Sequence, residues 1–136
     1  MQGLAIMSAL LNAASAVTTL VGSGVNARIY PVELPQAAPL PAIVIECGED
    51  NPHPPIDVAT TYLLRTVDVT LHILAKLPTD LSAVQLACES AAQFQRGSIG
   101  GFTVHLVSAS TVGSPEVDSG MGVWYLPVTF SITYRR

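Results

Sequence analysis

Two long segments of this chain alternate apolar and polar residues with a period of two. The apolar members are Val67, Val69, Leu71 and Ile73 in residues 61–74, and Trp124, Leu126, Val128, Phe130, Ile132 and Tyr134 in residues 122–134. Successive side chains of a strand point to opposite faces of a sheet, so each segment predicts a strand with one buried face. The polar face of this sheet is expected to meet water or a partner.

Two other segments repeat their apolar residues with helical spacing. One stripe lies in residues 2–21 (Leu4, Met7, Leu10, Leu11, Ala14, Val17 and Val21), and the other follows residue 78 (Leu81, Val84, Ala87, Cys88, Ala91 and Phe94). Both predict amphipathic helices with a buried face. Gly22 and Gly24 are expected to end the first helix, and Gly97 the second. Thr79 or Asp80 is the expected cap of the second helix.

The rest of the chain predicts shorter strands and loops. Residues 29–33 predict an outer extended piece, because prolines 31, 35, 39 and 41 remove backbone donors. Residues 42–47 and 102–108 predict strands, the second with Phe102, Val104 and Leu106 on one face. Residues 46–59 and 110–121 predict loops, the first being either a projecting arm or a solvated connection. Pro127 predicts an edge position or a bulge in the last strand.

The order helix, strands, helix, strands predicts the α+β class. We expect one domain over 1–136, a two-layer sandwich with a mainly antiparallel sheet and two amphipathic helices packed on one face. Only 12% of the residues are charged, against about 25% in a typical domain. This shortfall indicates burial against other proteins, with an ordinary apolar domain as the alternative.

The residues offer little for catalysis or metal binding. The net charge is −4 and no run of Lys or Arg is present, which argues against binding of nucleic acid. Asp68 and His72 share a strand face but lie about 13 Å apart, too far to hold one metal ion. Cys47 and Cys88 are expected to be small buried hydrophobes. We therefore expect no enzyme activity, no metal and no cofactor.

The apolar N-terminal segment could be mistaken for a secretion signal. Ala14-Ser15-Ala16 imitates a cleavage site, but no Lys or Arg precedes Arg28. Polar residues at 8, 12, 15 and 18 interrupt the run, which argues against a membrane span. We expect synthesis in the cytoplasm, no cleaved leader and no membrane partner.

The order of motifs resembles the tail-completion, or tail-terminator, proteins of long-tailed bacteriophages. A leading helix ends at a glycine turn, and Ala27-Arg28-Ile29-Tyr30-Pro31 follows. Leu34-Pro35-Gln36, Pro39-Leu40-Pro41 and the strand 42–45 come next, and the strand 65–74 and the second helix keep the family order. The closing segment 125–134 is similar to the family's ending, whereas the loop 46–59, with its double proline, departs from the pattern.

This resemblance implies a homohexameric ring in the neck of a virion, made in the host bacterial cytoplasm. Such a ring caps the tail tube protein and presents a surface to the head-side connector or stopper protein, while genomic DNA passes through the central hole without specific binding. An acidic lumen would repel phosphate. The candidate lumen or tube-contact residues are Glu49, Asp50, Asp57, Glu116 and Asp118, and the candidate subunit-interface residues are Leu86, Trp124 and Pro127.

Three alternatives remain open at this point. One is another head–tail joining or tail-tube protein of a phage or phage-like particle. Another is a small-ligand binding module with the same two layers, which would be monomeric or dimeric. A small hydrolase is the third.

Overall fold

The computed structural model describes residues 2–22, 27–31, 39–53, 64–118, 120 and 122–135, with only the backbone described at 52 and 53. The helices are α1 (Gln2–Ala13), α2 (Ser15–Val21) and α3 (Pro78–Ala92). The strands are β1 (Ile29–Pro31), β2 (Ala42–His53), β3 (Leu64–Ala75), β4 (Gly97–Ile99), β5 (Phe102–Val107), β6 (Thr111–Val112), β7 (Glu116–Asp118) and β8 (Val123–Arg135).

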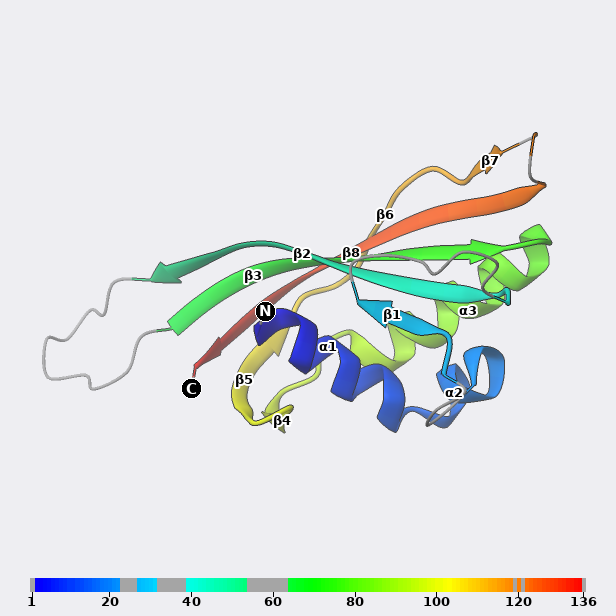
Figure 1. Ribbon diagram of the computed structural model, residues 1–136. Coiled ribbons are helices and arrows are strands. Elements are labelled where there is room, and N and C mark those ends of the chain that lie inside the picture. The colour runs from blue at the N-terminus through cyan, green and yellow to red at the C-terminus, as the bar shows by residue number, and fades with distance from the viewer. Residues whose placement is uncertain are drawn as a thin grey trace, which may run out of the picture.

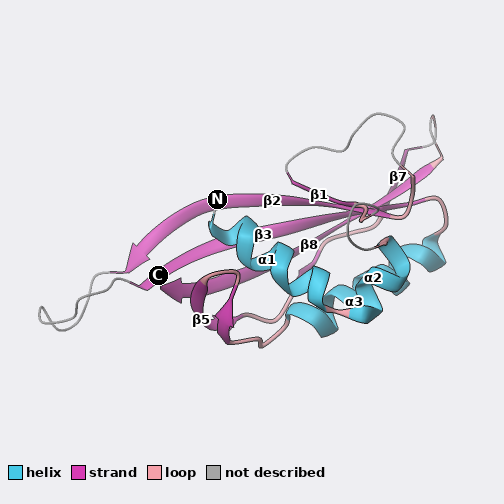
Figure 2. Ribbon diagram, turned by 60° about the horizontal axis from the view of Figure 1, so that its bottom comes forward, coloured by secondary structure: helices cyan, strands magenta, loops and turns pink. Residues whose placement is uncertain are grey.

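The expected α+β class is present, as a mixed and mostly antiparallel sheet with three helices. The main strand order is β1-β2-β3-β8-β5-β4, and β6 and β7 each pair with β8. The parallel pair β1–β2 was not expected. The sheet is long and curled, and α1, α2 and α3 all lie against one of its faces (Figures 1 and 2). We call the other face, which points away from the helices, the outer face.

The core lies between the helices and the inner face of the sheet. Its largest fully buried side chains include Tyr134, Phe130, Ile6, Met7, Leu11, Ile43, Leu71 and Ile73. The period-two segments behave as predicted where the structure describes them, because β3 and β8 pair along their length and alternate buried with more accessible residues. Residues 61–63 of the first predicted strand lie outside the described residues. Full burial of side chains this large contributes about 1.5–3 kcal/mol each.

The leading helix is not continuous, which corrects the expected single helix over residues 2–21. Ala14 has extended backbone angles (φ −91°, ψ 114°), and α1 and α2 are bent by 89°. A straight helix of this length would extend about 30 Å. The bend instead lets both Leu11 of α1 and Val17 of α2 be buried. Gly22 ends α2 with a φ of 84°, as expected, whereas Gly24 lies outside the described residues.

Helix α3 differs from its expectation at both ends. It begins at Pro78, with Leu77 at the cap position and no side-chain cap hydrogen bond, so Thr79 and Asp80 do not cap it. It ends at Ala92, and Gly97 begins β4. Phe94 therefore lies beyond the helix and is not part of the expected buried stripe. It has a φ of 60° and is 63% exposed, and its amide donates to the Val107 carbonyl at 2.8 Å.

Strand β5 also turns an apolar side chain outward. Val104 and Val107 are buried, but the register with β8 shifts between Val104 and Leu106. This bulge places Leu106 opposite Thr133, on the outer face, with 45% exposure. The expected face with Phe102, Val104 and Leu106 together is therefore wrong for Leu106, because a bulge adds one residue and reverses the alternation.

Both predicted loops contain strands. Residues Glu46–His53 belong to β2, with an irregular register between Cys47 and Asp50, so the loop 46–59 starts inside a strand. The segment 110–121 contains β6 and β7, which pair with β8. Short polar strands such as these are specified by their partner strand and leave little local signal.

Pro127 lies in an interior strand, so of the two expected settings the edge position is wrong, whereas the register of β8 with β6 and β7 is irregular beside it, as the expected bulge requires. Strand β3 flanks β8 on one side, while β5, β6 and β7 follow one another on the other side. The Pro127 carbonyl accepts from the Gly113 amide at 2.9 Å. Amide and carbonyl of one strand residue point to the same side. Pro127 has no amide hydrogen to donate, and the side of the residue that lacks it faces residues 113–115. Hydrogen bonding to β8 is interrupted there, between β6 and β7.

Candidate functional site

The outer face is rich in hydroxyl and carboxylate groups. Cross-strand hydroxyl pairs join β3 to β8, with 3.1 Å between Thr70 and Thr129 and 3.3 Å between Thr66 and Thr133. The register places these charged residues at outer-face strand positions, among the residues described: the carboxylates Glu46, Asp68, Glu116 and Asp118, and the guanidinium of Arg135. This face therefore carries more negative than positive charge.

A row of hydrogen bonds crosses the outer face at His72. Its Nε2 lies 2.6 Å from Glu46 Oε2 on β2, and its Nδ1 lies 2.6 Å from the Tyr125 hydroxyl on β8. The His72 and Tyr125 rings are stacked, with centroids 5.5 Å apart. Partial burial raises the pKa of Tyr125, and the charges of Glu116 and Glu46 raise it further. The phenol therefore remains a neutral hydrogen-bonding group, and the row ties three strands together.

A second polar cluster consists of Asp50 on β2, Arg65 on β3 and Tyr134 on β8. The irregular register after Cys47 places Asp50 opposite Val67, on the inner face. Its carboxylate accepts from Arg65 Nε at 3.1 Å and from the Tyr134 hydroxyl. The pKa of Tyr134 is raised to about 12, chiefly by burial and then by the hydrogen bond to Asp50 and that carboxylate's charge. These contacts hold the β2–β3 hairpin against β8.

The predicted lumen residues occupy different surroundings. Glu49 is exposed at the irregularity of β2, and Glu116 and Asp118 are exposed on β7. Asp50 is engaged internally, as described above. Asp57 lies outside the described residues. The structure thus brings Glu116 and Asp118 together on the outer face, while Glu49 lies on β2, apart from them.

The three predicted interface residues do not form one surface. Leu86 is 62% exposed on α3, and Trp124 is partly buried against the core. Pro127 pairs with His72 and lies on the outer face. Val112 and Val117 are exposed apolar residues that sequence reasoning missed. Their strands are only two and three residues long, too short to show an alternation.

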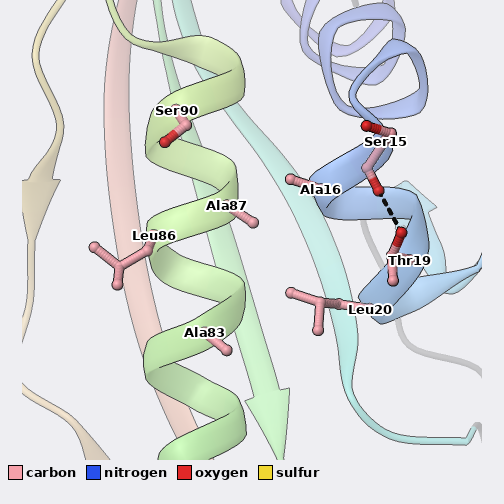
Figure 3. A pocket seen from close by; sticks show the side chains of 8 residues that line it. All are labelled: Ser15, Ala16, Thr19, Leu20, Ala83, Leu86, Ala87 and Ser90. Atoms are coloured by element: carbon pink, nitrogen blue, oxygen red, sulfur yellow. Dashed lines mark hydrogen bonds between the residues drawn. The ribbon is translucent and has the colours of Figure 1, made fainter.

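A shallow groove of about 470 Å³ lies between α2 and α3. Its lining consists of Ser15, Ala16, Thr19, Leu20, Ala83, Leu86, Ala87 and Ser90 (Figure 3). The lining contains no charged group and offers only hydroxyls and alkyl carbons. It can accommodate an uncharged protein surface, and it lacks the convergent polar groups that orient a small ligand.

Within the described parts of the chain, the side chains that could bind a metal or react as thiols are not arranged for that chemistry. No group of three or more His, Cys, Asp or Glu residues that could hold a metal ion occurs in the described parts of the chain. Burial raises the pKa of the Cys88 thiol to about 12 and raises that of Cys47 as well. Both thiols are therefore protonated at neutral pH and behave as apolar groups.

No described helix is by itself long and apolar enough to cross a membrane. Helices α1 and α2 reach that length and composition only as a pair, across their 89° bend.

No family model and no curated protein matches this sequence. Its fold is similar to that of a chain from the virion of a native gene transfer agent particle. The TM-score is 0.69, and the match covers 100% of this chain and 95% of the other at 11% sequence identity. At this identity the comparison establishes a shared fold over the whole of this chain and nearly all of the other.

Proposed function

We propose that this chain is a structural protein of a phage-like particle, in which it forms the ring that ends the tail tube. The observation that carries the proposal is the full-length fold likeness to a chain of a gene transfer agent virion. The ordered sequence motifs of the tail-terminator family point in the same direction. Its partners would be further copies of itself, the tail tube protein and the head-side connector.

The outer face is the surface that best fits a DNA channel. Its carboxylates and hydroxyls, with Arg135 as the basic group among the described strand positions, make a surface that repels phosphate. Proteins that hold DNA release counterions through many Lys and Arg contacts. A surface without such contacts lets DNA pass, which is what a channel used during ejection requires.

The long β2–β3 hairpin is suited to contact the tube or connector. In Figure 1 both strands continue past α1, beyond the part of the sheet that the helices cover. Asp50, Arg65 and Tyr134 brace the hairpin at this point. Glu49 lies on the same strand with its side chain exposed. A braced, projecting hairpin can present side chains to another protein at a defined angle.

The test is removal of this chain from a producing strain, followed by electron microscopy of the particles. The proposal expects tails of irregular length that are not joined to heads, and rescue by the wild-type chain. Heads that leak DNA beside free tails of normal length would instead assign a head-closure role. Loss of tail tubes altogether would assign a tube subunit. Particles indistinguishable from wild type would overturn the proposal.

A further inference from the structure

We infer that the open edge of strand β7 binds an extended segment of another protein, in which basic and apolar side chains alternate. We call residues 111–118, which contain β6 and β7, the β6–β7 edge. The segment joins the sheet as a further strand beside β7. The inference concerns a partner of different sequence and does not depend on the ring of the proposed function.

The β6–β7 edge is accessible along its whole length. Every residue from 111 to 118 is exposed. Strands β6 and β7 pair with β8 on one side, and no strand in the described parts of the chain pairs with their other side. Figure 1 shows both strands at the margin of the sheet, across β8 from β3. An unpaired strand edge presents backbone donors and acceptors that an extended segment of another chain can bind.

The backbone groups of Val117 point away from β8. The carbonyl of the next residue, Asp118, accepts from the amide of Gly122 at 2.7 Å, and Gly122 immediately precedes β8. The backbone of Asp118 therefore faces β8. Neighbouring residues of an antiparallel strand alternate between bonding to the partner strand and facing the other way. The amide and the carbonyl of Val117 are therefore directed to the open side, where a further strand can bind them.

Val112 of β6 has the same orientation. The Gly113 amide donates to the Pro127 carbonyl at 2.9 Å, so Gly113 faces β8 and Val112 faces the open side. Val117 is five residues after Val112, whereas their partners in β8 are four residues apart. The extra residue between β6 and β7 acts as a bulge, and it gives both valines the same backbone direction and the same side-chain face.

The two faces of the β6–β7 edge carry different side chains. On the helix side, Val112 and Val117 are 40% and 50% exposed, because their partners in β8 lie on the inner face of the sheet. On the outer face, Glu116 and Asp118 are exposed and lie two residues apart on β7. A strand beside β7 meets the carboxylates with one set of alternate side chains and a valine with the other. Alternating basic and apolar residues match both faces.

This chain does not itself contain such a segment. Its basic residues are Arg28, Arg65, Lys76, Arg96, Arg135 and Arg136. No two of them lie two residues apart, so no part of the chain presents two successive basic side chains on one face of a strand. Pairing of two β7 edges would bring Glu116 and Asp118 close to the same carboxylates of a second copy, which repel them. Charge complementarity therefore selects a different protein.

The experiment uses the full chain and a synthetic peptide of about six residues in which lysine alternates with valine. Binding is followed by NMR titration and by amide hydrogen exchange. The peptide is expected to slow exchange of the Val117 amide at least about tenfold, because that amide gains a partner. Two control peptides are expected to bind at least about tenfold more weakly. One has glutamate in place of lysine, and the other has methylated backbone nitrogens, which cannot donate.

Two pairs of variants separate the backbone from the charges. Val117→Pro removes the outward amide and is expected to weaken binding about tenfold, whereas Val117→Thr keeps the amide and most of the affinity. Glu116→Lys with Asp118→Lys is expected to reverse the preference, so that the glutamate peptide binds better. Glu49→Lys with Asp68→Lys makes the same change in net charge on β2 and β3, and should keep the wild-type preference.

Circular dichroism and thermal melting establish that each variant folds, and if Val117→Pro does not fold, the charge variants and the methylated peptide decide. The inference is overturned if the wild-type chain does not bind the lysine peptide, or if the methylated peptide binds equally well. It is also overturned if the slowed exchange appears on another strand, or if both double-lysine variants reverse the preference. The proposed function fails separately, when the chain is absent from the tails of purified particles.

Discussion

Gly113 lies directly against the ring of Pro127. A Cβ atom added to Gly113 would come within 2.6 Å of Pro127 Cγ, and the Gly113 amide donates to the Pro127 carbonyl at 2.9 Å. Gly113, which has no side chain, thus lies beside the proline that interrupts the hydrogen bonding of strand β8. This contact explains how an interior strand contains a proline.

Gly113→Ala is therefore expected to destabilise the protein. The added methyl group must displace the Pro127 ring or the segment between β6 and β7, which costs about 1–3 kcal/mol of unfolding free energy. Chemical denaturation measures the change. Gly48→Ala is the control, because its added carbon would meet the Asp68 carbonyl oxygen at an ordinary 3.4 Å. Equal effects of the two substitutions would contradict this interpretation of Gly113.

Stability should fall in strong alkali because of Tyr134. Its pKa is raised to about 12 in the folded chain, against about 10 in an unfolded one. A raised pKa favours the protonated folded form, so this contribution is complete below pH about 10 and is lost as the pH rises toward about 12. Tyr125, whose pKa is also raised, contributes with the same sign.

The measurement is the denaturation midpoint of wild type and of Tyr134→Phe at a series of pH values. Tyr134→Phe should be less stable at neutral pH, because Asp50 loses its hydroxyl partner, and should lose less stability between pH about 10 and about 12. Identical alkaline slopes for the two proteins would show that Tyr134 is not the responsible group.

Phe94 occupies a left-handed backbone conformation that disfavours bulky side chains. With a φ of 60°, this position tolerates asparagine well and β-branched residues poorly. Phe94→Asn is expected to be more stable than Phe94→Val by about 1–2 kcal/mol, although valine is the more apolar residue. Thermal or chemical unfolding of the two variants makes the comparison. A more stable valine variant would mean that burial, and not backbone strain, governs this position.

Glu49 and Asp50 should respond differently to lysine. Glu49→Lys reverses an exposed charge, so the fold should tolerate it while DNA passage or tail joining suffers. Asp50→Lys places a cation beside Arg65 and removes the Tyr134 acceptor, so it should destabilise the fold by about 1–3 kcal/mol. Unfolding measurements and particle infectivity separate the two effects. Normal infectivity of the Glu49→Lys particle would argue against a contact role for Glu49.

The local pattern of residues was sufficient to predict β3, β8 and most of α3. Period-two and period-3.6 repeats are properties of neighbouring residues, and their buried faces follow from the repeat alone. Val67, Phe130 and Val84 are buried as their positions predict. The outer-face positions of Glu116 and Asp118 were not predicted, because β7 exists only through its pairing with β8.

The sequence by itself thus determined the class of fold and the long strands. The tertiary structure decided the bend at Ala14, the outward side chains of Phe94 and Leu106, and the inward carboxylate of Asp50. Each of these depends on contacts between residues far apart in the chain. The helix bends to follow a curled sheet, a bulge reverses an alternation, and a carboxylate turns inward because Arg65 and Tyr134 lie there to receive it. No repeat among neighbouring residues encodes such a partner.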